Sequence, residues 1–165
     1  MSQLRGYEMF SKHLFAAALS IAAFVAGGAQ AETAVLTVSH NGEQTAMTMD
    51  ELKAMPATSF TTSTQWTEGG PVEFTGVSLA DFAAAFGVTE GTISATAIND
   101  YTVKIPVSDA VEGGPIIAYA MNGNEMSRRD KGPLWVIYPF DDKPDYKAET
   151  YYSRAIWQLD RVTFE

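Results

Sequence analysis

The fold of this chain is decided by a nearly continuous apolar stretch, Ile116-Ile117-Ala118-Tyr119-Ala120-Met121, which ends at Asn122-Gly123. A short apolar run that is bounded by a turn signal is typical of a buried strand. Residues 134–140 form a second run of this kind, entered through the basic loop of residues 127–133. Both runs are therefore predicted to be strands.

Outward from these two runs, the chain shows further strand signals and two short helix signals. Alternating or β-branched residues predict four more strands, over residues 35–39, 58–66, 92–98 and 101–105. Helices are predicted from a capping box at residues 48–51 to Pro56, and from Ser78 to Gly87. Because strands outnumber helices and no linker divides the chain, we predict one β-rich α+β domain.

The first 31 residues have the three-part pattern of a secretory signal. Basic residues precede an apolar run at residues 14–25, and Ala29-Gln30-Ala31 offers small side chains at the positions that a signal peptidase reads. The run is too short to span a bilayer, with an uncleaved anchor as the alternative. We expect residues 1–31 to be a signal peptide cleaved after Ala31, and residues 32–165 to be a periplasmic domain without a membrane span.

The composition excludes several classes of function. The chain has 165 residues, enough for one domain, and its 20 acidic and 11 basic residues give a net charge of -9. Such a charge repels nucleic-acid phosphates, so no nucleic-acid partner is expected. The chain has 0 cysteines and 2 histidines, which excludes disulfides, thiol catalysis and a histidine-rich metal centre. We accordingly predict neither catalytic residues nor metal ligands.

A basic cluster is the first candidate ligand-binding feature. Arg128, Arg129 and Lys131 share one loop of an otherwise acidic chain. Guanidinium groups on a loop are suited to bidentate contact with phosphate, sulfate or carboxylate. A solvated hairpin tip that balances nearby acids is the alternative interpretation.

An aromatic segment near the C-terminus is the second candidate feature. It reads Tyr151-Tyr152-Ser153-Arg154 and is followed by Trp157. Tyr152 and Arg154 could line a pocket for a planar ligand through stacking and cation–π contact. An amphipathic edge whose aromatic rings close the core is the alternative.

Four segments carry a resemblance to a known family. Residues 74–82 are similar to the family segment W-x-G-V-x-L-x-D-L-L, with Phe74 in place of the tryptophan. The other three matches are residues 97–106 with D-G-Y … I-P, residues 117–123 with L-A-Y-x-x-N-G, and residues 131–139 with G-x-P-x-R-x-V-x-P. Together they resemble the oxidoreductase molybdopterin-binding domain over about residues 35–165. The resemblance implies a mixed, barrel-like sheet of the sulfite oxidase type.

The resemblance also bears on the site. Asn99, Asp100 and Tyr101 stand where the family has its D-G-Y segment, so they join the candidate ligand-binding residues. In the catalytic members a cysteine thiolate upstream of the first segment binds molybdenum, whereas residues 60–66 hold no cysteine here. Molybdopterin is therefore the candidate cofactor by resemblance, without the residue that would ligate its metal.

Three functions are consistent with these observations. The leading hypothesis is a non-catalytic binding module for a small anionic or planar ligand, such as a pterin, held by the candidate residues above. The second is a molybdopterin-dependent oxidoreductase whose metal is held only by dithiolene and solvent ligands. The third is an accessory or sensory interaction protein of the cell envelope, which an exposed patch around Trp66, Trp135 or Trp157 would favour.

Overall fold

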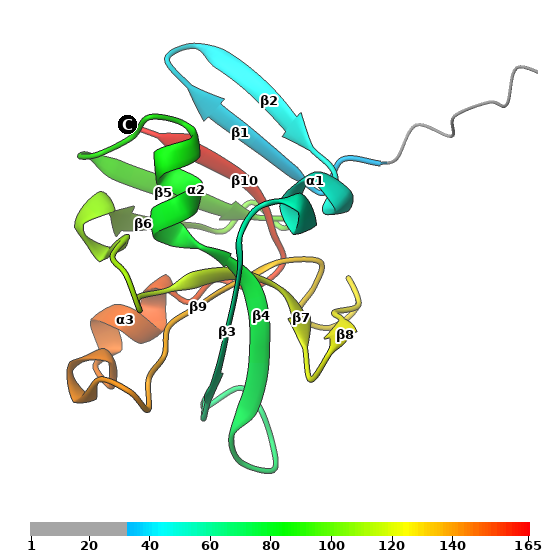
Figure 1. Ribbon diagram of the computed structural model, residues 1–165, viewed down its shortest axis with the longest axis vertical. Coiled ribbons are helices and arrows are strands. Elements are labelled where there is room, and N and C mark those ends of the chain that lie inside the picture. Colours follow the sequence, from blue (N-terminus) through cyan, green and yellow to red (C-terminus); the bar gives the residue numbers. More distant parts are fainter. Residues whose placement is uncertain (1–32) are drawn as a thin grey trace, which may run out of the picture. The chain divides into compact units, whose positions relative to one another are not determined.

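The computed structural model describes residues 33–165, so the predicted signal peptide and its cleavage site lie outside the described residues. Residues 33–165 form two sheets and three short α-helices, the sheet-rich α+β arrangement that the sequence predicts (Figure 1). Among the helices of residues 33–165, none has the length and hydropathy that spanning a bilayer requires.

The first sheet brings the two ends of the described chain together. Its strand order is β2 (Glu43–Met47), β1 (Leu36–His40), β10 (Leu159–Phe164), β5 (Thr92–Ala97) and β6 (Thr102–Pro106). β1 and β2 form a hairpin, and its turn residues Asn41 and Gly42 have φ values of 51° and 81°. β10 pairs parallel to β1 and antiparallel to β5, so the C-terminal segment lies in the middle of the sheet.

The second sheet contains the stretch that decides the fold. Its strand order is β3 (Ala57–Thr62), β4 (Val72–Ser78), β7 (Ile116–Met121) and β8 (Asn124–Glu125), and β9 (Trp135–Ile137) also pairs with β7. The register between β4 and β7 shifts at Gly76, where an added Cβ would lie 2.1 Å from the carbonyl oxygen of Ile117. Only glycine allows this close approach of two backbones. Both sheets are open and neither closes into a barrel.

The helices begin and end where local signals place them. They are α1 (Met49–Ala54), α2 (Leu79–Ala85) and α3 (Glu149–Arg154), with 3-10 turns η1 (Val107–Asp109) and η2 (Pro144–Tyr146). The predicted capping box of Thr48 and Glu51 starts α1, and the Ser78 side chain accepts from the Asp81 N–H at the start of α2. In Figure 1, α2 lies across the first sheet. The Phe82 ring of this helix packs against Phe164 of β10, with 6.1 Å between the ring centroids.

Two predicted strands are shorter in the structure. The strand expected over residues 58–66 ends at Thr62, because Ser63 donates its backbone N–H to Asp141 instead of to a neighbouring strand. The run over residues 134–140 is buried throughout but is a strand only at Trp135–Ile137. Pro139 cannot donate to a ladder, which limits pairing there. Helix α3 and strand β10 were not individually predicted.

Candidate functional site

A cleft of about 380 Å³ lies between the β5–β6 turn, the loop after β3, helix α3 and the segment that leads into β10. Its lining is aromatic and amide-rich, with side chains of Trp66, Tyr101, Tyr152, Trp157, Gln65, Asn99 and Gln158. Glu149 supplies the charged side chain of this lining. Aromatic walls with a few convergent polar groups, in a hollow of this volume, are typical of small-molecule sites.

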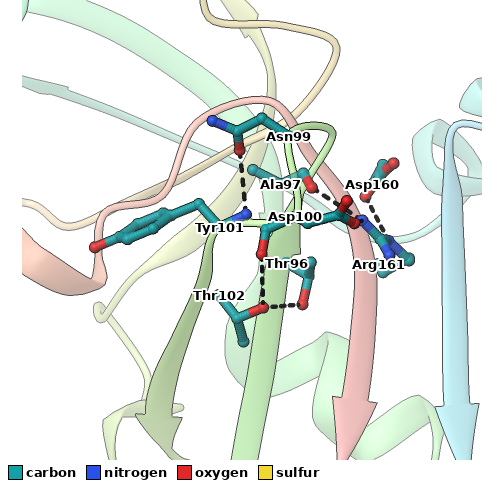
Figure 2. Close-up of polar contacts among 8 residues, drawn as sticks. All are labelled: Thr96, Ala97, Asn99, Asp100, Tyr101, Thr102, Asp160 and Arg161. Carbon is teal, nitrogen blue, oxygen red and sulfur yellow. Dashed lines mark hydrogen bonds and ion pairs between the residues drawn. The ribbon is translucent and has the colours of Figure 1, made fainter.

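The β5–β6 turn presents Tyr101 to the cleft and is held from the other side by Arg161 of β10 (Figure 2). The Arg161 guanidinium donates to the Ala97 carbonyl oxygen at 3.1 Å and to Oδ1 of Asp100 at 2.6 Å. Oδ1 of Asn99 accepts from the Tyr101 backbone N–H at 3.2 Å. Figure 2 shows the Tyr101 ring and the Arg161 side chain on opposite sides of the turn. Tyr101 is 57% exposed, so its ring forms an accessible rim.

Trp66, on the loop after β3, is the centre of an aromatic cluster that forms another wall. Its ring centroid lies 5.6 Å from that of Trp157, 5.9 Å from that of Tyr152 and 6.1 Å from that of Trp135. These edge-on arrangements are the ones that aromatic pairs prefer. Trp135 is fully buried, and its Nε1 donates to the Ala155 carbonyl oxygen at 3.3 Å. The wall is therefore anchored in the core.

Helix α3 is fixed to the rest of the domain by a buried ion pair. Nη1 of Arg154 donates to Oδ2 of Asp109 at 2.8 Å, and the Tyr138 hydroxyl donates to the same oxygen at 2.8 Å. Burial and the neighbouring Asp109 carboxylate raise the pKa of Tyr138, so the phenol remains a neutral donor. This network holds the helix that carries Tyr152 and Ser153 to the cleft.

The basic cluster lies beside the cleft and not in its lining. The Lys131 ammonium stands over the Trp157 ring, 4.9 Å from its centroid. Arg128 and Arg129 are exposed on their loop. The carbonyl oxygen of Arg128 accepts from Nε2 of Gln158 at 2.8 Å, which ties the loop to the segment before β10.

The structure divides the predicted ligand-binding residues into two sets. The cleft lining includes Asn99, Tyr101 and Tyr152. The residues that do not line it are Asp100, Arg128, Arg129, Lys131 and Arg154. Asp100 and Arg154 are each engaged by an opposite charge, Arg161 and Asp109 respectively. Their charges therefore serve the architecture around the cleft.

Sequence reasoning missed Gln65, Glu149 and Gln158 as lining residues, and it considered Trp66 only for an interaction surface. One signal could have found most of them. A glutamine stands directly beside a tryptophan twice, as Gln65-Trp66 and as Trp157-Gln158. An amide next to a large aromatic ring offers a polar edge and an apolar face at one place, which is what a small-molecule site needs.

The residues present do not fit molybdopterin. The chain has 0 cysteines, so it offers no thiolate to ligate the metal. By the family resemblance, the metal-ligating cysteine would lie in residues 60–66. In this chain that segment instead contributes Trp66 to the aromatic cluster. Among the described residues that line the cleft none is Lys or Arg, so no cation there neutralises the cofactor's phosphate.

Comparison with known proteins identifies the fold. Residues 23–140 match the family model described as "Oxidoreductase molybdopterin binding domain", which stops before helix α3. The structure is similar to that of the sulfane dehydrogenase SoxCD from Paracoccus pantotrophus, with a TM-score of 0.59 and 17% sequence identity over 78% of this chain. The chain spans 37% of the length of that solved chain. No curated protein sequence matches it. The predicted sulfite oxidase-type fold is thereby confirmed.

Proposed function

Because the chain belongs to the oxidoreductase molybdopterin-binding domain family but lacks a cysteine to ligate the metal, we propose that it is an exported, non-catalytic binding module. Its ligand is a small planar molecule bound in the cleft between Tyr101 and the cluster around Trp66. Of the two ligand types expected from the sequence, the planar one is favoured because the cleft lining carries no basic side chain.

The observation that carries this proposal is the convergence of aromatic rings and side-chain amides on one cleft. The rings of Trp66, Tyr101 and Trp157 offer faces and edges against which a flat molecule stacks. Each amide, as in Asn99 and Gln158, offers both donors and an acceptor that read the edge of a heterocycle. Together these groups recognise a planar ligand by its faces and by its rim.

The lining residues lack the pairing that nucleophilic catalysis needs. Ser153 is the serine of the cleft lining and so the candidate nucleophile. Its Oγ donates to the Thr150 carbonyl oxygen at 2.8 Å, which is the ordinary hydrogen bond of a helical serine. An activated serine would instead donate to a general base. The lining contains no histidine, because His40 lies on the β1–β2 hairpin. A binding role therefore suits these residues better than catalysis.

The packing of the tryptophans makes an interaction protein the weaker hypothesis. Trp135 is fully buried, while Trp66 and Trp157 are half-buried around the cleft. Among the described residues, the exposed large hydrophobic ones are Tyr101 and Val111. An extended apolar patch typical of a protein interface would need several such residues together.

A titration followed by tryptophan fluorescence tests the site. A flat, uncharged bicyclic probe such as 4-methylquinoline at pH 8 is expected to quench Trp66 and Trp157. Tyr101→Leu removes one ring face from an exposed position and should weaken binding about twofold to tenfold. Val111→Ala, a change at an exposed residue that does not line the cleft, should leave affinity unchanged. Equal affinity of Tyr101→Leu and the wild type would show that the site is wrongly assigned.

Export is tested separately by the mass of the protein recovered from the periplasmic fraction. Cleavage after Ala31 gives a mature chain that begins at Glu32. Recovery of the full-length chain from the membrane fraction would instead support the uncleaved anchor.

A further inference from the structure

The charges around the cleft narrow the class of planar ligand, an inference that rests on the function proposed above. We propose that the ligand is an organic cation of the N-alkylated heteroaromatic class, whose positive charge lies against the tryptophan and tyrosine rings. Three features of the molecule support this class of ligand: the aromatic walls, the Lys131 ammonium that lies against one of their rings, and the sign of the charge in the cleft.

The aromatic walls are the first feature. Trp66, Tyr101, Tyr152 and Trp157 all line one cleft of about 380 Å³. The face of an aromatic ring carries the negative end of its quadrupole and attracts a cation within about 6 Å of the centroid. A desolvated site with several such rings is the arrangement that recognises alkylated nitrogen cations.

A cation from the protein already rests on this cluster. The Lys131 ammonium lies 4.9 Å from the Trp157 centroid and 6.0 Å from that of Trp135. Lys131 does not line the cleft, so it approaches the cluster from outside the ligand's space. The Trp157 ring, which also lines the cleft, thus already has a positive charge over it.

The sign of the charge inside the cleft is the third feature. Glu149 is the charged lining residue, and within residues 33–165 it has no ion-pair partner. Of the cations nearby, Arg154 is paired with Asp109 and Lys104 with Glu165, while Lys131 lies outside the lining, against the Trp157 ring. The whole chain carries a net charge of -9. A cation would therefore be attracted both by the rings and by the field of the protein, whereas an anion would face Glu149 and the ring quadrupoles.

The test compares three flat probes built on one bicyclic ring. These are N-methylquinolinium, a cation; 4-methylquinoline at pH 8, its neutral isostere; and quinoline-4-carboxylate, an anion. Isothermal titration calorimetry on the mature chain should give the cation an affinity about twofold to thirtyfold higher than the neutral probe. The affinity of the cation should fall with added salt, while that of the neutral probe should not.

Two variants, which remove charges of opposite sign, test the effect of charge on binding of the cation. Glu149→Gln is isosteric at an exposed position and should weaken binding of the cation about twofold to fivefold without affecting the neutral probe. Lys131→Met keeps an apolar stem over Trp157 but removes a repelling charge, so it should strengthen binding of the cation. Glu112→Gln, at an exposed carboxylate that does not line the cleft, is the matched control and should change the affinity neither for the cation nor for the neutral probe.

The outcomes separate this inference from the function on which it rests. Equal binding of the cation and its neutral isostere, or an unchanged affinity in both Glu149→Gln and Lys131→Met, overturns the cation inference and leaves the planar-ligand module standing. Preference for the carboxylate, weakened by Lys131→Met, overturns the inference in favour of an anion. Failure of all three probes to bind overturns both proposals.

Discussion

Arg154 and Asp109 form the ion pair that positions the helical wall of the cleft. Nη1 lies 2.8 Å from Oδ2, and the two side chains are only 20% and 10% exposed. Tyr138 donates to the same carboxylate oxygen, so one acidic side chain from η1 joins the end of β9 to the end of α3. The position of Tyr152 in the cleft therefore depends on the Arg154–Asp109 ion pair, which lies outside the cleft lining.

Asp109→Asn should destabilise the domain by about 2–3 kcal/mol. The substitution leaves the largely buried Arg154 without a counter-charge, and part of the full cost of a broken buried pair is relieved by solvent. Urea denaturation at pH 7 measures the change in the free energy of unfolding. Asp142→Asn, at an exposed site, should stay within about 0.5 kcal/mol of the wild type. An Asp109→Asn variant of wild-type stability would contradict the role given to this pair.

Arg161→Met should affect ligand binding more than stability. The ion pair with Asp100 is exposed, at 44% for Arg161 and 82% for Asp100, so its loss should cost less than about 1 kcal/mol of unfolding free energy. Without Arg161, the β5–β6 turn loses its support from β10. Tyr101 must then be ordered when the ligand binds, and this cost should lower the affinity for a planar probe about twofold to fivefold.

Arg129→Met is the control for Arg161→Met, because Arg129 is exposed and does not line the cleft. It removes the same charge from the chain and should leave the unfolding free energy and the affinity for the planar probe unchanged. If the two variants bind the probe equally well, Arg161 does not position the turn.

Asp141 gives the loop that carries Trp66 a dependence on pH. Hydrogen bonds from Lys147 and from the Ser63 backbone lower the pKa of Asp141 from 3.8 to about 2. Because the pKa is lower in the folded state, the carboxylate stabilises the fold fully above pH 3.8, and this contribution is lost as the pH falls toward 2.

The variant Asp141→Asn measures that contribution. It should be less stable than the wild type at pH 6, by less than about 1 kcal/mol because solvent screens the pair. The difference in melting temperature should close between about pH 4 and pH 2. A difference at pH 2 as large as at pH 6 would rule out ionisation of Asp141 as its cause.

Gly76→Ala tests the close approach of β4 and β7. The added methyl would lie 2.1 Å from the Ile117 carbonyl oxygen and 2.6 Å from the Ala118 Cα, so one strand must shift. We expect a loss of at least about 3 kcal/mol of unfolding free energy. Thr61→Ala, at an exposed site of neighbouring β3, should cost less than about 1 kcal/mol. A small effect of Gly76→Ala would mean that the two strands separate readily.

The parts of the fold that could be predicted from the sequence are those with local causes. Thr48 and Ser78 cap their helices through bonds to residues three positions later, and Asn41-Gly42 sets its own turn. Strand β10 is different, because its parallel pairing with β1 joins the two ends of the described chain. Such a partner is chosen by the packed sheet and leaves no signal at short range.

The candidate site divides in the same way. The aromatic segment that contains Tyr152 was found because stacking residues are recognisable by type. The role of Arg154 was not predictable, because its partner Asp109 lies 45 residues away and only the fold brings them together. That Lys131 binds an anion stays a prediction, and in the structure its ammonium lies against the Trp157 ring.

In the function proposed here, this family member binds its ligand without a molybdenum centre. The most direct test is elemental analysis, combined with assay of released pterin, on protein produced with its own N-terminal segment in cells supplied with molybdate. We predict no stoichiometric molybdenum or pterin in a sample that still binds the flat probe. Stoichiometric molybdenum with released pterin would contradict the claim.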